Sequence, residues 1–258
     1  MYNTRFLFGA FLILVVVTIA IFAPHLAPFD PLKSGVQMLE PSSRSHWLGT
    51  DELGRDVLSR VIYGARSSLL VGAGAAAIAL AIGVFIGLVA GYFRGWVDTL
   101  FNPVIDLFIS LPALVLALLI TVVVGVSFSS LILTLGFVMW PPIARLIRAQ
   151  VLSVRERTYI EAAQALGGSS AWIIRRHILP NIITLVASQF AITVAFAIFT
   201  SASLSFLGLG VPPPTPDWGT IVRAGYEFLT INPWMSLGPG GAVTLTVIGF
   251  YLLGSSFR

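Results

Sequence analysis

The chain has 258 residues, of which 57% are hydrophobic and only 10% are charged, and its formal net charge is +4. Soluble domains carry about 25% charged residues, because a small protein has a large surface to hydrate. This composition excludes an ordinary soluble protein and predicts a chain that lies largely in lipid. The absence of cysteine also excludes disulfides, thiolate metal sites and a cysteine nucleophile.

The first apolar run covers residues 6–23, follows Arg5 and ends at Pro24. It is long enough to cross a bilayer as one helix. A cleaved signal peptide is the alternative, but its apolar region would exceed the usual length of about 7–15 residues, and Pro24 lies where cleavage should occur. We therefore expect a retained N-terminal transmembrane helix within residues 1–24.

Further spans are predicted at residues 67–92, 104–124, 130–147, 182–210 and 235–257. The chain is thus expected to be an all-α membrane protein with six transmembrane helices. Residues 25–66 would form an external loop, and residues 67–258 a core of five helices. The fourth span contains Pro141 and Pro142, which should break or kink it, so we expect this helix inside the bundle, where neighbours can satisfy the freed backbone groups.

The loop between spans four and five is strongly basic. It carries Arg145, Arg148, Arg155, Arg157, Arg175 and Arg176. Short basic loops stay in the cytoplasm, where they face anionic lipid, so both termini are predicted to be cytoplasmic. This setting explains the basic balance better than nucleic acid does, and no nucleic-acid partner is expected. The first loop does not follow this positive-inside rule, since it also carries several basic residues yet is assigned to the outside.

Two spans carry small or weakly polar residues at intervals of four. In the second span these are Ala75, Ala79, Gly83, Gly87 and Gly91, a face that lets two helix backbones approach closely, within this subunit or at a subunit interface. In the fifth span they are Gln189, Thr193, Ala197, Ser201 and Ser205. The second stripe fits a solute pathway, with Gln189, Thr193, Ser201 and Ser205 as its polar members, and it fits plain helix packing equally well.

Few charged residues lie near the spans. Asp106, close to the inner end of span three, is expected to be solvated or to serve packing. In the first loop, Asp51 and Arg55, like Asp56 and Arg60, have the spacing of weak helical ion pairs. His46 with Asp51 and Asp56 would be a poor metal ligand set, and no metal site is predicted.

The loop at residues 149–180 predicts a short helix on the cytoplasmic face. Thr158 and Glu161 have the spacing of a capping box, and Gly167 and Gly168 should end the helix. A second helix can begin at Ser169 or Ser170. Ala162 and Ala163 form a small patch on the first helix. From the residues alone, docking of another protein and an amphipathic helix resting on lipid remain equal alternatives.

This loop resembles a known family. Glu161-Ala162-Ala163, three further residues, Gly167 and then Leu179-Pro180 are similar to the EAA loop of ABC importer permeases, with His177 in place of the usual isoleucine. The resemblance implies that the helix docks on an ATPase subunit, a role that falls to Glu161, Ala162, Ala163, Leu166 and Gly167.

Two other motifs narrow the resemblance. Residues 46–60 (HWLGTDELGRDVLSR) and 204–219, beginning LSFLGLGVPPP, resemble the second, C-type permease of the branch that imports dipeptides, oligopeptides and nickel. The resemblance implies a type I importer bundle in a bacterial or archaeal cytoplasmic (inner) membrane. It also implies a second homologous permease, two ATP-binding subunits that hold ATP and Mg, and an extracytoplasmic solute-binding protein.

The sequence contains no phosphate-binding loop and no assembled nucleophile, so this chain is expected to be no enzyme and to hold no cofactor of its own. A secondary transporter would show intramembrane charges and inverted repeats, and neither is evident. We expect peptides to be moved by alternating access driven by the partner ATPases. Nickel or another small solute is the alternative substrate.

Overall fold

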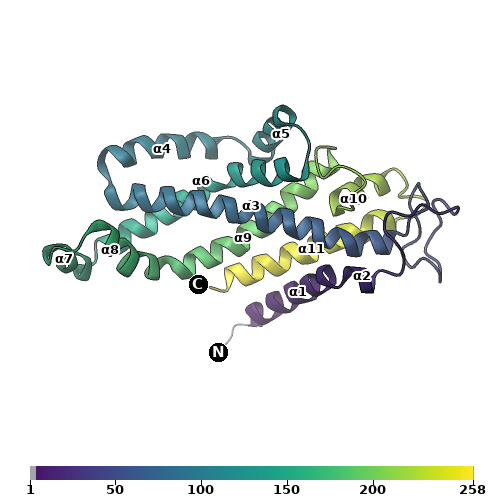
Figure 1. Ribbon diagram of the computed structural model, residues 1–258, viewed down its shortest axis with the longest axis horizontal. Coiled ribbons are helices and arrows are strands. Elements are labelled where there is room, and N and C mark those ends of the chain that lie inside the picture. Colours follow the sequence, from purple (N-terminus) through teal and green to yellow (C-terminus); the bar gives the residue numbers. More distant parts are fainter. Residues whose placement is uncertain (1–3, 258) are drawn as a thin grey trace.

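The computed structural model describes residues 4–257, and the regular structure in this range is helical (Figure 1). The helices are α1 (Thr4–Ile21), α2 (Ala23–Leu26), α3 (Val57–Phe93), α4 (Gly95–Ser110), α5 (Ala113–Val124), α6 (Phe128–Arg155), α7 (Thr158–Ala165), α8 (Ser170–Ile173), the π-helical segment η1 (Ile174–Ile178), α9 (Leu179–Phe206), α10 (Trp218–Tyr226) and α11 (Trp234–Ser255). The predicted all-α class is confirmed.

Five helical stretches in residues 4–257 are long and apolar enough to cross a membrane, namely α1, α3, α6, the continuous run 170–206 and α11. The predicted third span, residues 104–124, is different. It consists of α4 and α5, which meet at an angle of 93° and together could form a sixth, broken span. Leu111 precedes Pro112 and takes an extended conformation (φ −93°, ψ 135°), because the proline ring disfavours helical geometry in the residue before it.

Two other boundaries differ from expectation. Helix α3 begins at Val57, inside the region predicted as external loop, because the Asp56 carboxylate accepts a hydrogen bond of 2.7 Å from the Ser59 amide and caps the helix. Helix α6 runs without a break through Pro141 and Pro142. Its predicted place inside the bundle is confirmed, since Trp140, Ile143 and Ala144 are all buried.

The most extensive helix contact in the bundle joins α3 to α6. All five small residues predicted to form a packing face on α3 are fully buried there. A methyl group on Gly87 would lie 2.7 Å from the carbonyl oxygen of Ala144 and 2.8 Å from Cβ of Ile147. Gly83 and Gly91 are equally close to Ile143 and Val151. The small face therefore serves packing within this subunit, the first of the two predicted alternatives.

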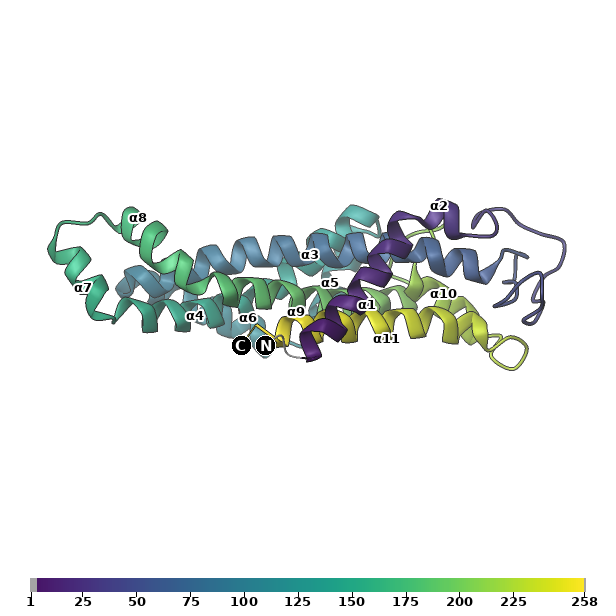
Figure 2. The same cartoon turned by 90° about the horizontal axis from the view of Figure 1, so that it is seen from below.

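The remaining helices surround this pair. Helix α9 packs on α3 and α11, while α1 lies at the edge of the bundle against α11 and α3 (Figure 2). Both α1 and α11 point their free ends toward the side of the molecule that carries α7, and the loop 27–56 lies at the opposite end (Figure 1). That opposite end is called the outer end below, and the α7 end is called the inner end.

The first loop is held by charged side chains. Asp51 is buried and binds Arg55 at 2.7 Å, as its spacing predicts, but both residues lie in a loop and not on a helix. The predicted pair of Asp56 with Arg60 is wrong. Arg60 instead approaches Asp51 at 3.4 Å, because Asp56 is occupied by the α3 cap and by His46 Nδ1 at 2.8 Å.

We predict that Gly87→Ala lowers the stability of the folded chain. The new methyl group must push α3 away from the Ala144 carbonyl on α6, and overpacking of this kind costs about 1–3 kcal/mol. Thermal unfolding of the purified protein in detergent measures the effect. The matched control is Gly241→Ala on α11, where a methyl group meets no atom within 4 Å and should raise helix propensity by up to about 1 kcal/mol. Equal stability of the two variants would contradict the close contact.

Candidate functional site

Helix α7 protrudes from the inner end of the bundle, between α6 and the run that continues into α9 (Figures 1 and 2). Its start differs from the predicted capping box. Thr158 is already the first helical residue, and Arg157, in extended conformation, occupies the cap position without a side-chain hydrogen bond. Glu161 therefore falls one position too late to reach back to the cap, and its amide bonds to the Arg157 carbonyl instead.

Helix α7 ends at the glycines, as the sequence predicts. Gly167 has a φ of +81°, a conformation that residues with a Cβ rarely adopt. Its amide donates to the Gln164 carbonyl at 3.0 Å, and the Gly168 amide donates to the Ala163 carbonyl at 3.0 Å. These two bonds form a Schellman motif, which satisfies carbonyls that the helix end would otherwise leave free. Gly167 thus fixes both the length of α7 and the direction of the chain after it.

The predicted docking residues form one exposed surface. Glu161, Ala162, Leu166 and Gly167 are exposed, Leu166 at 89%, while Ala163 is half-buried. Ile160 is the only buried residue of α7. It joins the hydrophobic core formed by α6 and the base of α9. Ile160 is therefore the buried anchor of α7, half-buried Ala163 packs against the same core, and the exposed faces of the helix are available to a partner.

A groove of about 470 Å³ lies beside this surface, lined by Ala162, Leu166, Tyr159, Trp172 and His177 among others. The Trp172 and His177 rings meet edge to face at 4.9 Å, and Tyr159 lies 6.0 Å from His177. The departure from the family pattern at His177 is therefore accommodated inside an aromatic cluster. The predicted second helix is confirmed, since Ser169 caps α8 by accepting from the Trp172 amide.

Ion pairs join α4 to α6. Arg148 holds Asp98 through two bonds of 2.5 Å, and Arg145 pairs with Asp106. Asp106 thus binds a cation at an exposed position. The sequence analysis missed Asp98, although the spacing of Asp98, Asn102 and Asp106 places three polar side chains on one face of α4 and could have indicated a partner helix.

The polar stripe on α9 is mostly closed within this chain. Thr193, Ser201 and Ser205 are 6%, 2% and 0% exposed, and Gln189 is half-buried. Ala197 belongs to a core cluster that contains residues of α3 and α6. In this chain the stripe is a helix-packing surface, which was the alternative interpretation, and a solute pathway along it stays a prediction for the assembled transporter. Ser205, at the outer end of the stripe, lines a cavity.

Residues 4–257 contain no group of three His, Asp or Glu side chains placed to hold a metal ion. His46 is engaged with Asp56, and its ring stacks at 4.7 Å on Phe29. The two candidate sites on this chain are therefore a protein-docking surface at the inner end and the α9 stripe that leads to the outer end.

The comparisons with known proteins agree with this arrangement. Residues 83–258 match the family model for the binding-protein-dependent transport system inner membrane component, and residues 1–41 match the N-terminal TM domain of oligopeptide transport permease C. The chain is 37% identical over 257 residues to the dipeptide transport system permease protein DppC of Alkalihalophilus pseudofirmus, which covers 99% of this chain and 84% of the relative.

Two further relatives are similarly close. The glutathione transport system permease protein GsiD of Pectobacterium atrosepticum is 35% identical, over 95% of this chain and 82% of its own length. The oligopeptide transport system permease protein OppC of Bacillus subtilis is 35% identical, over 99% of this chain and 84% of its own length.

The fold is shared with a chain in the inward-facing structures of the MetNI methionine ABC transporter. The TM-score is 0.65 at 20% identity, covering 76% of this chain and 93% of that one, and the predicted type I importer fold is confirmed. The family match extends over most of the core helices, including the whole of α6, α7 and α9. The chain therefore belongs to the family of binding-protein-dependent transport system inner membrane components.

Proposed function

We propose that this chain is the permease subunit of an ABC importer that carries peptides inward, with ATP hydrolysed on partner chains. The observation that carries this proposal is α7, a short helix with one buried anchor and an exposed surface of small and apolar residues. The relatives described above are named for dipeptides, oligopeptides and glutathione, which is itself a tripeptide. Peptides are therefore the substrate class that these relatives support.

The chemistry of α7 favours a protein partner over lipid headgroups. An interfacial lipid-binding helix needs a broad apolar face, whereas α7 exposes Glu161 and Gln164 together with alanines. Small side chains let another backbone approach closely. Leu166 is almost fully exposed, and its transfer into a protein interface would be worth about 1.5–3 kcal/mol. The inner groove beside Leu166 offers a complementary shape for a side chain of the partner.

The partners proposed for this chain are a second related permease, two ATP-binding subunits and an extracytoplasmic solute-binding protein. ATP and Mg would be held by the ATP-binding subunits, with this chain supplying α7 as their point of contact. Helix α7 is connected directly to α6 and, through α8 and η1, to α9. Movement of α7 would thus act on both helices, and coupling requires that nucleotide state bias two arrangements of them.

This proposal fixes the orientation, with α7 and both termini in the cytoplasm. Three arginines near α7, Arg157, Arg175 and Arg176, are exposed, as the positive-inside rule expects. The basic residues of the first loop opposed this orientation. Two of them, Arg55 and Arg60, bind the buried Asp51 and so help to hold the first loop together at the outer end.

We predict that Gly167→Val reduces peptide uptake while the protein still inserts and assembles. Valine is strained at a φ of +81°, so the Schellman motif should be lost and α7 should leave its docking geometry. Coupling free energies of about 1–3 kcal/mol correspond to losses of about 5–150-fold. Uptake of a labelled tripeptide by cells and ATPase activity of the purified complex measure the effect.

The matched control is Gly125→Val. Gly125 also has a positive φ (+91°) and also has open space around its Cα, but it lies at the outer end of α5. Gly125 has a ψ of 159°, in a region that is essentially restricted to glycine, so valine there carries at least as much backbone strain as valine at Gly167. Normal uptake in Gly167→Val, or an equal loss in Gly125→Val, would count against a coupling role of α7.

We also predict that Leu166→Ala weakens retention of the ATP-binding subunits during purification. The substitution removes an exposed side chain from α7 and should leave the unfolding temperature of the permease unchanged. Val36→Ala, at a residue 98% exposed in the first loop, is the control. The stoichiometry of chains after affinity purification, measured by quantitative mass spectrometry, tests the prediction. Unchanged retention in Leu166→Ala relative to Val36→Ala would show that this surface is not the contact.

A further inference from the structure

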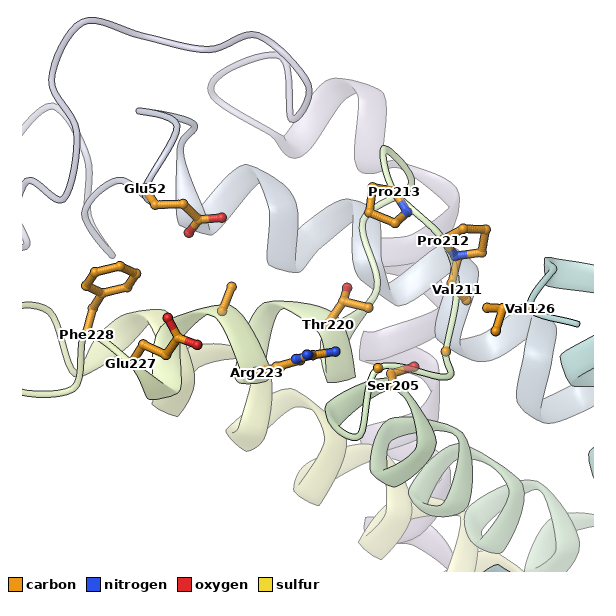
Figure 3. Close-up of a pocket in the computed structure, with 13 residues that line it drawn as sticks. Glu52, Val126, Ser205, Val211, Pro212, Pro213, Thr220, Arg223, Glu227 and Phe228 are labelled. Carbon is orange, nitrogen blue, oxygen red and sulfur yellow. The ribbon is translucent and has the colours of Figure 1, made fainter. Parts of the chain in front are cut away.

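A cavity of about 520 Å³ opens at the outer end of α9, where the loop 207–217, helix α10 and the first loop meet (Figure 3). Its size lies within the range of about 300–1,000 Å³ that is usual for small-ligand pockets. Ser205, the outermost residue of the α9 stripe, forms part of its wall. The cavity therefore lies where a solute pathway along that stripe would begin.

The wall formed by α10 is firmly attached to α3. Asp217 caps α10, accepting from the Thr220 amide, and also accepts a hydrogen bond of 3.2 Å from Ser68 on α3. Burial raises the pKa of the Asp217 carboxyl, and these hydrogen bonds oppose that rise. Trp218 Nε1 donates to the Val61 carbonyl at 2.9 Å. Side chains on α10 are therefore presented from a rigid element, as a binding site requires.

Arg223 projects from α10 into the cavity. Helix α9 ends in a Schellman motif, in which Gly208 has a φ of +90° and the Leu209 amide donates to the Leu204 carbonyl. The Arg223 guanidinium passes directly over Gly208, where any side chain would collide with it. It makes no ion pair or hydrogen bond with the part of the chain that the structure describes. Figure 3 shows it extending toward Ser205.

Two carboxylates occupy another part of the same cavity. Glu227 follows Arg223 by four residues, a spacing at which opposite charges on a helix commonly pair, yet the two are not paired. The nearest cation to Glu52 is Arg55 at 3.7 Å. Glu52 Oε2 is shielded from solvent and has no hydrogen-bond partner among residues 4–257. The cavity thus contains one cation and one anion that form no ion pair within residues 4–257, Arg223 and Glu227, and a Glu52 carboxylate that pairs with Arg55 through one oxygen and lacks a donor at the other.

The remaining wall is apolar. Val126, Val211, Pro212 and Pro213 lie together on the side away from Glu227 (Figure 3). A ligand that satisfies all parts of the cavity needs a carboxylate, an ammonium group and a compact apolar portion. A short peptide with free ends has these three features. Arg223 and Glu227 are exposed in this chain, so the charged ends of a peptide can reach them and form charge-assisted hydrogen bonds.

We infer that this cavity is a subsite of the permease for short peptides with free ends, in which Arg223 binds the carboxylate and Glu52 with Glu227 binds the ammonium group. The inference rests on the proposed function and adds a recognition site on this chain. It places selection for free peptide termini in the permease, at the entrance to the α9 stripe.

The test uses the membrane complex of both permeases and the two ATP-binding subunits, reconstituted in nanodiscs. The solute-binding protein is left out because it would bind peptide itself. The probes are radiolabelled Ala-Ala-Ala, its C-terminal amide and its N-acetyl derivative, measured by equilibrium binding. Arg223→Gln should weaken binding of Ala-Ala-Ala about tenfold, equivalent to about 1.4 kcal/mol, and should leave binding of the amide unchanged. Glu227→Gln should weaken binding of Ala-Ala-Ala and leave binding of the N-acetyl derivative unchanged.

The control is Arg44→Gln, which removes an exposed arginine from the first loop. The subsite is overturned if the wild-type importer binds none of the probes, if each variant weakens all three probes equally, or if Arg44→Gln has the effect of Arg223→Gln. Uptake of the same tripeptide by cells distinguishes failure of the subsite from failure of the proposed function. If cells take up the tripeptide and any of these outcomes is observed, the subsite alone is refuted. If cells take up no peptide, the proposed function is refuted.

Discussion

The close contact between α3 and α6 is the constraint on which the other features depend. In lipid no hydrophobic force drives helices together, so association relies on van der Waals contact between matched surfaces. Here the glycines and alanines of α3 receive the branched side chains of Ile143, Ile147 and Val151. This contact fixes the direction of α6 and therefore the place from which α7 protrudes. It also helps α6 to keep its course through Pro141 and Pro142, since α3, α4, α5 and α9 all pack against α6.

Helix α3 also organises the outer end. Its first turn is capped by Asp56, which binds His46 and so ties down the first loop. A little further along, a methyl group on Gly64 would lie 2.9 Å from the Trp218 ring, which shows how closely α10 sits on α3. One helix thus positions the docking helix at one end, through α6, and the walls of the outer cavity at the other. The two candidate sites are far apart in space but share a single rigid support.

The features that could be predicted from the sequence are those that depend on composition and on local spacing. Apolar runs located most spans, and glycine chemistry located the end of α7 at Gly167. The bend at Leu111 was missed because the apolar run continues across it, and hydropathy carries no information about the backbone before Pro112. The capping box at Thr158 was wrong because the helix begins one residue earlier than the motif requires. The pairs of Asp98 with Arg148 and of Asp51 with Arg60 depend on tertiary placement, which spacing along the chain does not encode. The same holds for the placement of Arg223 and Glu52 around one cavity.

A continuous helical run connects the two ends of the molecule. Residues 170–206 form 37 residues of unbroken helix, about 55 Å long, from the base of α7 to the wall of the outer cavity. The polar stripe of α9 lies on this run and is packed against its neighbours, so a pathway along it can open only if the run moves. The π-helical turns at Ile174–Ile178 sit close to α7, and π-helical segments are frequent at functional sites. A displacement applied to α7 would therefore enter the run beside its least regular segment and reach Ser205 through rigid helix. On the proposed function, a partner that moves α7 would therefore act on the helical run that carries the packed polar stripe.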